Sequence, residues 1–138
     1  MRLLGVVAVS AALTVAGLGA GTAQAEAAPG CSSTVQIGST AYAKYQGEIS
    51  ASVKQFKGCG KNWAYIYVWD QFRAKHLDYY LISFIAIGDD AFGYKESATG
   101  ARELWSSGTD TLAACTRADG AIFGRDADYG YAETDQRC

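Results

Sequence analysis

Hydrophobic and polar residues alternate along much of the chain after residue 40, which is the pattern of half-buried β-strands. The clearest strand is predicted over residues 63–73. One of its faces carries aromatic rings, and the other begins with the small aliphatic residues Ala64, Ile66 and Val68. Residues 79–87 are apolar at both odd and even positions, which predicts a central strand covered on both sides.

Shorter strands complete the predicted fold. They are expected over residues 42–46, 49–56, 92–95, 104–105, 109–115 and 121–123. Turn residues such as those of the Gly58-Cys-Gly-Lys-Asn62 segment separate them. The tail from residue 125 is polar, and we expect Cys138 to hold it in place. The pattern predicts an all-β fold, a small sandwich or barrel, in a single domain of residues 26–138.

Residues 1–25 read as a cleaved signal peptide. Arg2 precedes a long apolar stretch, and Ala23-Gln24-Ala25 supplies the small residues that a signal peptidase requires. Cleavage after residue 27 or 28 is an alternative. A membrane anchor fits less well, because the stretch is short and rich in small residues. We therefore expect a secreted protein with no membrane contact after cleavage.

Composition narrows the classes of function. The 138 residues carry a net charge of −2, and their hydrophobic content is 49%, which excludes an intrinsically disordered chain. The charge has the wrong sign for a protein that tracks a nucleic-acid backbone. Three Trp, nine Tyr and five Phe all lie after residue 25. This density requires either a large aromatic core or a functional aromatic surface.

The four cysteines predict two disulfides. They are Cys31, Cys59, Cys115 and Cys138. Of three possible pairings we favour the nested one, which joins Cys31 to Cys138 and Cys59 to Cys115, because chain ends need tying down. The sequential pairing is the close alternative. Their spacings contain no zinc-binding motif, and we expect no cofactor.

The sequence shows no recognisable catalytic constellation. The single histidine, His76, follows Arg73 and Lys75 in a polar stretch that predicts a solvated loop. Carboxylate pairs of the glycosidase kind could be drawn from Glu48, Asp70, Glu96 and Glu103. The spacing of these four places no two of them together. We expect no enzymatic activity.

A metal site is not expected either. Asp126 and Asp128, followed by Gly130, resemble the start of a calcium-binding loop. The closing glutamate of such a loop is missing, so a flexible acidic loop is the preferred interpretation.

The aromatic face of the strand over 63–73 is the strongest candidate for a binding site. It presents Trp63, Tyr65, Tyr67 and Trp69 at intervals of two residues, about 6.6–6.8 Å apart. Such rings can stack on sugars or anchor a protein partner. Trp105 adds a second edge to the candidate surface. A location of the same rings in the core is the competing interpretation.

The segment before that strand carries a resemblance. Residues 52–64 end in Cys59-Gly-Lys-Asn-Trp63-Ala64, a Cys-x-x-x-Trp-Ala motif followed by an aromatic strand. This resembles a group of small secreted actinobacterial proteins of unknown function. The resemblance implies secretion and a disulfide-linked β domain, and it implies no activity.

Three hypotheses of function follow. The first is a secreted, non-catalytic binding module that uses the aromatic face to hold cell-wall polysaccharide or an extracellular protein. The second is an inhibitor of an extracellular hydrolase, with residues 57–62 or 97–108 as its protruding loop. The third is a small secreted hydrolase, which would require His76 or a carboxylate pair to lie in a pocket.

Overall fold

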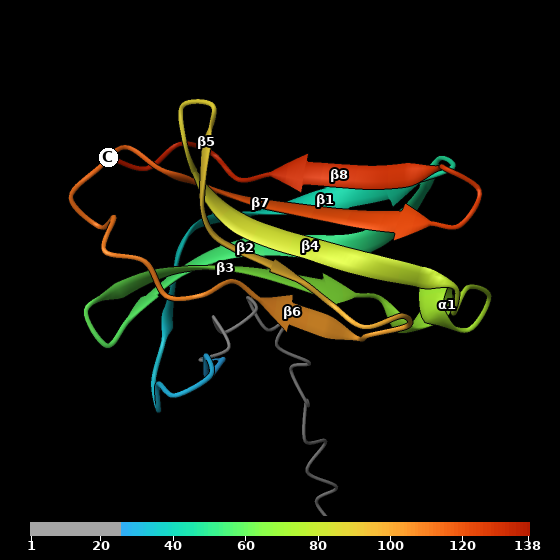
Figure 1. Ribbon diagram of the computed structural model, residues 1–138, viewed down its shortest axis with the longest axis horizontal. Helices are drawn as coiled ribbons and strands as arrows, with labels where there is room; N and C mark the ends of the chain where they lie inside the picture. The colour runs from blue at the N-terminus through green and yellow to red at the C-terminus, as the bar shows by residue number, and fades with distance from the viewer. Residues whose placement is uncertain (1–25) are drawn as a thin grey trace, which may run out of the picture.

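The protein is a sandwich of two four-stranded antiparallel sheets (Figure 1). The computed structural model describes residues 26–138, so the predicted signal peptide lies outside the described residues. Sheet A has the strand order β1-β2-β3-β6, and sheet B has the order β5-β4-β7-β8. The strands are β1 (Val35–Tyr45), β2 (Glu48–Gly58), β3 (Lys61–Val68), β4 (Tyr79–Ile87), β5 (Asp90–Glu96), β6 (Glu103–Trp105), β7 (Arg117–Gly124) and β8 (Tyr129–Glu133). The predicted all-β fold with two disulfides is confirmed.

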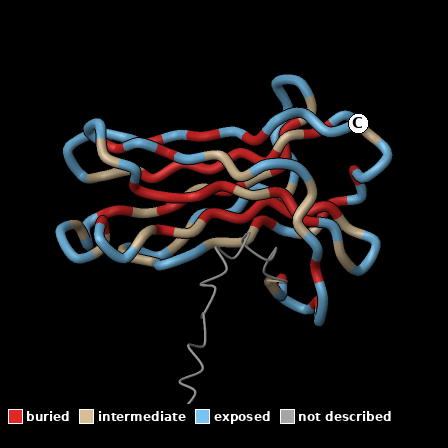
Figure 2. Tube along the Cα trace, turned by 180° about the vertical axis from the view of Figure 1, so that it is seen from behind, coloured by how far each residue is buried: buried red, intermediate tan, exposed pale blue. Residues whose placement is uncertain are grey.

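The core lies between the two sheets, as the buried positions in Figure 2 show. Ala64, Ile66 and Val68 of β3 are completely buried there. They belong to the same core cluster as Leu81 of β4 and Ile122 of β7. The two sheets approach closely: a Cβ at Gly120 would lie 2.6 Å from Val53 Cγ2.

The strand predicted over residues 63–73 is shorter than expected. It ends at Val68, and a single helical turn, α1 (Asp70–Arg73), follows. A continued strand would direct Asp70 into the core, where an unpaired carboxylate is costly. The helical turn leaves Asp70 exposed and still buries Phe72, which is 1% exposed.

Strand β4 matches its predicted bounds, but it is not covered on both sides. Leu81 and Ile85 are buried, whereas Tyr80, Ile82 and Phe84 on the outer face of sheet B are only half-buried. Rings of neighbouring strands partly shield that face. Tyr80 of β4, for example, stacks on Phe123 of β7 with centroids 5.3 Å apart.

The segment 109–115 is not a strand, contrary to the prediction. Thr109 forms an isolated bridge with Asn62, and its hydroxyl lies 2.7 Å from that of Thr111. Asn62 in turn donates to Thr111 Oγ1 and Thr116 Oγ1. These side chains turn inward and hydrogen-bond one another. Residues 109–115 are therefore held by buried side-chain hydrogen bonds and not by pairing along the edge of a sheet.

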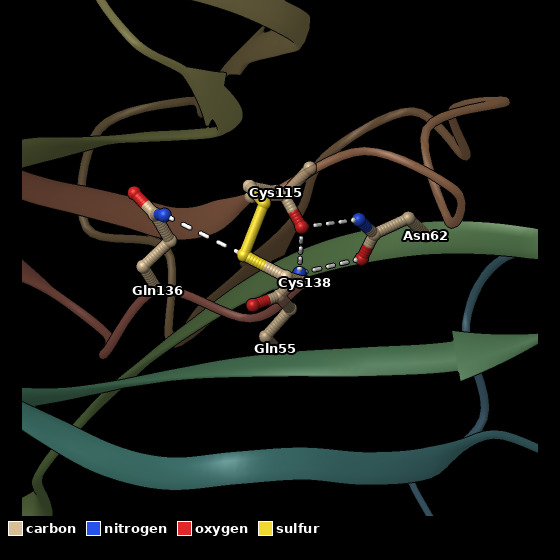
Figure 3. Close-up of a disulfide and its surroundings, with 6 residues drawn as sticks. Gln55, Asn62, Cys115, Gln136 and Cys138 are labelled. Atoms are coloured by element: carbon tan, nitrogen blue, oxygen red, sulfur yellow. Dashed lines mark hydrogen bonds between the residues drawn. A yellow bond between two sulfur atoms is a disulfide. The ribbon is translucent and has the colours of Figure 1, made fainter.

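The disulfides join Cys31 to Cys59 and Cys115 to Cys138. The favoured nested pairing is therefore wrong, and the sequential alternative is the one observed. Cys31 reaches the β2–β3 turn because the N-terminal segment folds back over sheet A. Cys138 reaches Cys115 because the isolated Thr116–Arg137 bridge pairs the final residues with the residue that precedes β7. Figure 3 shows this second disulfide close to Gln55 and Asn62.

Among residues 26–138, no helix has the length and apolar character needed to span a bilayer.

Replacing both Cys31 and Cys59 by Ser should lower the free energy of unfolding by about 3.5 kcal/mol, because the bridge closes a loop with a sequence separation of 28. Urea unfolding followed by tryptophan fluorescence measures the change. A peptide map under non-reducing conditions should show only the two sequential pairs, and a Cys31–Cys138 peptide would contradict the structure.

Candidate binding groove

The alternation of β3 places Trp63, Tyr65 and Tyr67 on the outer face of sheet A, because Ala64, Ile66 and Val68 take the inner face. Neighbouring strands extend this outer face. Tyr65 stands opposite Lys54 of β2 and opposite Trp105 of β6.

The aromatic face divides into a covered half and an open half. Trp63 and Tyr65 are only 8% and 3% exposed, because they pack in one cluster with Phe56, Ala28 and Cys31. The last two belong to the N-terminal segment, residues 26–34, which lies on the outer side of sheet A near β3 and β6 (Figure 1). Tyr67, Trp69 and Trp105 remain half-buried. The competing interpretation, a location in the core, therefore applies to Trp63 and Tyr65, whereas Tyr67, Trp69 and Trp105 stay partly accessible.

An open groove of about 640 Å³ lies over the exposed half. Its lining includes Tyr65, Tyr67, Trp69, Trp105, Lys54 and Glu103. Glu26 and Ala27 of the N-terminal segment and Asp70 and Gln71 of α1 also line it. The groove thus combines an aromatic floor with charged and amide groups along its borders.

Trp69 is held in a fixed orientation at the end of the groove. It lies just after β3 with an extended backbone (φ −69°, ψ 142°), and its amide donates to the carbonyl of Ser50. Its indole Nε1 donates to Ser52 Oγ at 2.7 Å. Tyr42 packs edge-on against it, with ring centroids 5.9 Å apart. A preoriented, half-exposed indole of this kind loses little entropy when it stacks on a ligand.

Charged groups pair around the aromatic floor. Lys54 Nζ lies 2.9 Å from Glu26 Oε1, and Arg102 Nη1 lies 2.8 Å from Asp70 Oδ1. Tyr65 donates its hydroxyl proton to Glu103 Oε2 at 2.5 Å. Burial raises the pKa of Tyr65 well above its usual value, and the hydrogen bond to Glu103 and the charge of Glu26 raise it further. Tyr65 therefore remains protonated at neutral pH.

The other sequence candidates lie elsewhere. His76 lines a separate cavity of about 270 Å³ and stacks on Phe72, with centroids 4.4 Å apart. The expected loop is present, with Lys75 and Asp78 exposed, but the His76 ring itself is half-buried against Phe72. Of the four candidate carboxylates, Asp70 and Glu103 line the groove, whereas Glu48 forms an ion pair with Lys75. Glu96 accepts from the hydroxyl of Tyr94.

Asp126 and Asp128, which resemble the start of a calcium-binding loop, accept hydrogen bonds from other side chains. Asp126 accepts from the hydroxyl of Tyr45 at 2.8 Å, and Asp128 accepts from the side-chain amide of Gln46. Within the described part of the chain, no cluster of three His, Cys, Asp or Glu side chains could hold a metal ion.

Sequence reasoning missed Glu26, Ser52 and Lys54. The alternation over 49–56 does put Ser52 and Lys54 on one face. Only the β2–β3 register, in which Ser52 stands opposite Tyr67, brings them to the aromatic floor. Glu26 arrives through the fold-back of the N-terminal segment, for which the sequence carries no local signal.

Comparison of the chain with known protein families, with characterised proteins and with solved structures gives no match.

A Tyr65→Phe variant should lose less stability than the wild type at alkaline pH. Because the folded-state pKa of Tyr65 lies above its usual value of 10.0, its contribution is complete below that value and is lost as the pH rises toward the folded-state pKa. Urea unfolding at about pH 8 and about pH 11 measures this loss. Tyr129→Phe, at a ring 63% exposed, is the matched control. Equal alkaline losses in wild type and Tyr65→Phe would contradict this account.

Proposed function

We propose that this protein is a secreted, non-catalytic carbohydrate-binding module that holds a polysaccharide chain in the groove on the outer face of sheet A. The observation that carries the proposal is the half-buried aromatic floor of Tyr67, Trp69 and Trp105 within an open groove. An open groove, unlike an enclosed cavity, admits the interior of a polymer as well as its end.

The chemistry of the groove suits a sugar. A pyranose ring has an apolar C–H face, which can stack on an indole or phenol ring. Its rim of hydroxyl groups needs hydrogen-bond partners, and the borders of the groove offer Lys54, Gln71 and Glu103 at this rim. A few polar groups placed around an apolar surface are typical of sites that orient a small ligand or a segment of a polymer.

The inhibitor hypothesis finds less support, because a disulfide or hydrogen bonds tie each candidate loop to the sandwich. Residues 57–62 form the tight β2–β3 turn that the Cys31–Cys59 bridge fastens to the N-terminal segment. In the segment 97–108, the amides of Ser97 and Gly100 donate to carbonyls of β4, and β6 pairs with β3.

Trp69→Ala should weaken the binding of soluble wall polysaccharide by at least about tenfold, or about 1.4 kcal/mol, because it removes a stacking surface. Affinity electrophoresis of the secreted protein measures the effect. Trp69 is partly exposed and lies outside the main core, so the variant should still unfold cooperatively, with a midpoint lowered by the loss of its contacts with Ser52 and Tyr42.

Two further variants make this test specific. Tyr67→Ala should weaken binding in the same way, because its ring lies on the same floor. Tyr129→Ala removes an exposed ring from sheet B and should leave binding unchanged. Unaltered binding in folded Trp69→Ala and Tyr67→Ala, or an equal loss in Tyr129→Ala, would contradict the proposed site.

A further inference from the structure

Around Tyr65, the lining of the groove has more hydrogen-bond acceptors than donors. The hydroxyl of Tyr65 has one proton, and it donates this proton to Glu103 Oε2. Glu26 Oε1 receives the ammonium of Lys54, whereas Glu26 Oε2 is buried and has no partner among the described residues. The lone pairs of Tyr65 and the second oxygen of Glu103 are further acceptors. A ligand that fits here must bring donors.

The charges of the groove also favour a ligand with hydrogen-bond donors, because they favour a positively charged one. Lys54 is engaged by Glu26, and Arg102 is engaged by Asp70. Glu103 forms no ion pair with any residue of the range 26–138 covered by the structure. The lining therefore holds three carboxylates, Glu26, Asp70 and Glu103, against the single ammonium of Lys54. Such a site disfavours uronic acids and sulfated or phosphorylated sugars.

An alkylammonium group meets both requirements. It has three donors and no acceptor, and its positive charge strengthens each hydrogen bond to a carboxylate. The aromatic rings beside these carboxylates add a favourable surface for a cation. Among sugars, this group occurs in hexosamines whose amine is not acylated.

We propose that the groove selects polysaccharide segments that contain an amino sugar with a free ammonium group, which lies between Glu103, Glu26 and the hydroxyl of Tyr65. This inference rests on the proposed carbohydrate-binding function and names its ligand class. In it Glu103 is the main specificity determinant, because its carboxylate accepts from the Tyr65 hydroxyl but forms no ion pair with any described residue.

The test compares two ligands that differ only at the amine. Oligosaccharides of glucosamine and of N-acetylglucosamine of equal length are titrated into the secreted protein by calorimetry, at a slightly acidic pH that keeps the free amine charged. The glucosamine oligomer should bind about tenfold more tightly. Glu103→Gln keeps the shape of the side chain and an acceptor for Tyr65, and it should abolish this preference.

Control variants separate charge from stacking. Asp90→Asn removes an exposed carboxylate of β5, on the other sheet, and should leave the preference intact. Trp69→Ala should weaken both oligomers alike, because stacking does not depend on the amine.

The outcomes are distinct for the two proposals. Equal affinities for the two oligomers would overturn the amino-sugar inference and leave carbohydrate binding standing. This is also the result expected if the α-ammonium of Glu26, freed by cleavage after residue 25, occupies the acceptors. A preference that persists in Glu103→Gln would overturn the role of Glu103. Failure of both oligomers, and of other polysaccharides, to bind would overturn the carbohydrate-binding function itself.

Discussion

Burial of the aliphatic face of β3 against sheet B is the contact on which the rest of the structure depends. Ala64, Ile66 and Val68 are fully buried, and they pack with residues of both sheets. Because side chains alternate along a strand, this burial commits Trp63, Tyr65 and Tyr67 to the outer face. The sandwich can therefore close only by placing large aromatic rings on its outside.

The N-terminal segment resolves part of this problem. Ala28 and Cys31 cover Trp63 and Tyr65, and the bridge to Cys59 holds the segment in place. The cover stops short of Tyr67 and Trp69, and the groove opens where it ends. The same segment thus completes a small second core and forms one border of the candidate site. The covering of Trp63 and Tyr65 and the border of the groove thus both result from the way the N-terminal segment folds back over sheet A.

The sequence predicted those parts of the fold in which inward residues are large. Residues 79–87 are an example, because Leu81 and Ile85 mark the buried face. Strand β8 was missed because its inward residues are Gly130 and Ala132, which give no hydrophobic signal. A larger side chain does not fit there: a Cβ at Gly130 would lie 2.7 Å from the carbonyl oxygen of Lys44.

Only part of the candidate site could be predicted from the sequence. Its rings follow from alternation, whereas Glu26 and Lys54 depend on long-range register.

Gln55, Asn62 and Thr116 form a buried polar cluster at one end of the core, and this cluster affects the register between β2 and β3. Sliding β2 by two residues along β3 would keep every side chain on its own face, so hydrophobic burial alone barely distinguishes the two alignments. Gln55 Nε2 distinguishes them, because it donates to Asn62 Oδ1 at 2.9 Å and to Thr116 Oγ1 at 2.7 Å only in the observed alignment (Figure 3). That alignment also sets Lys54 opposite Tyr65 on the other side of the sheet. A few amide and hydroxyl groups inside the sandwich therefore act together with the tight β2–β3 turn to fix the alignment that places Lys54 beside the aromatic floor outside.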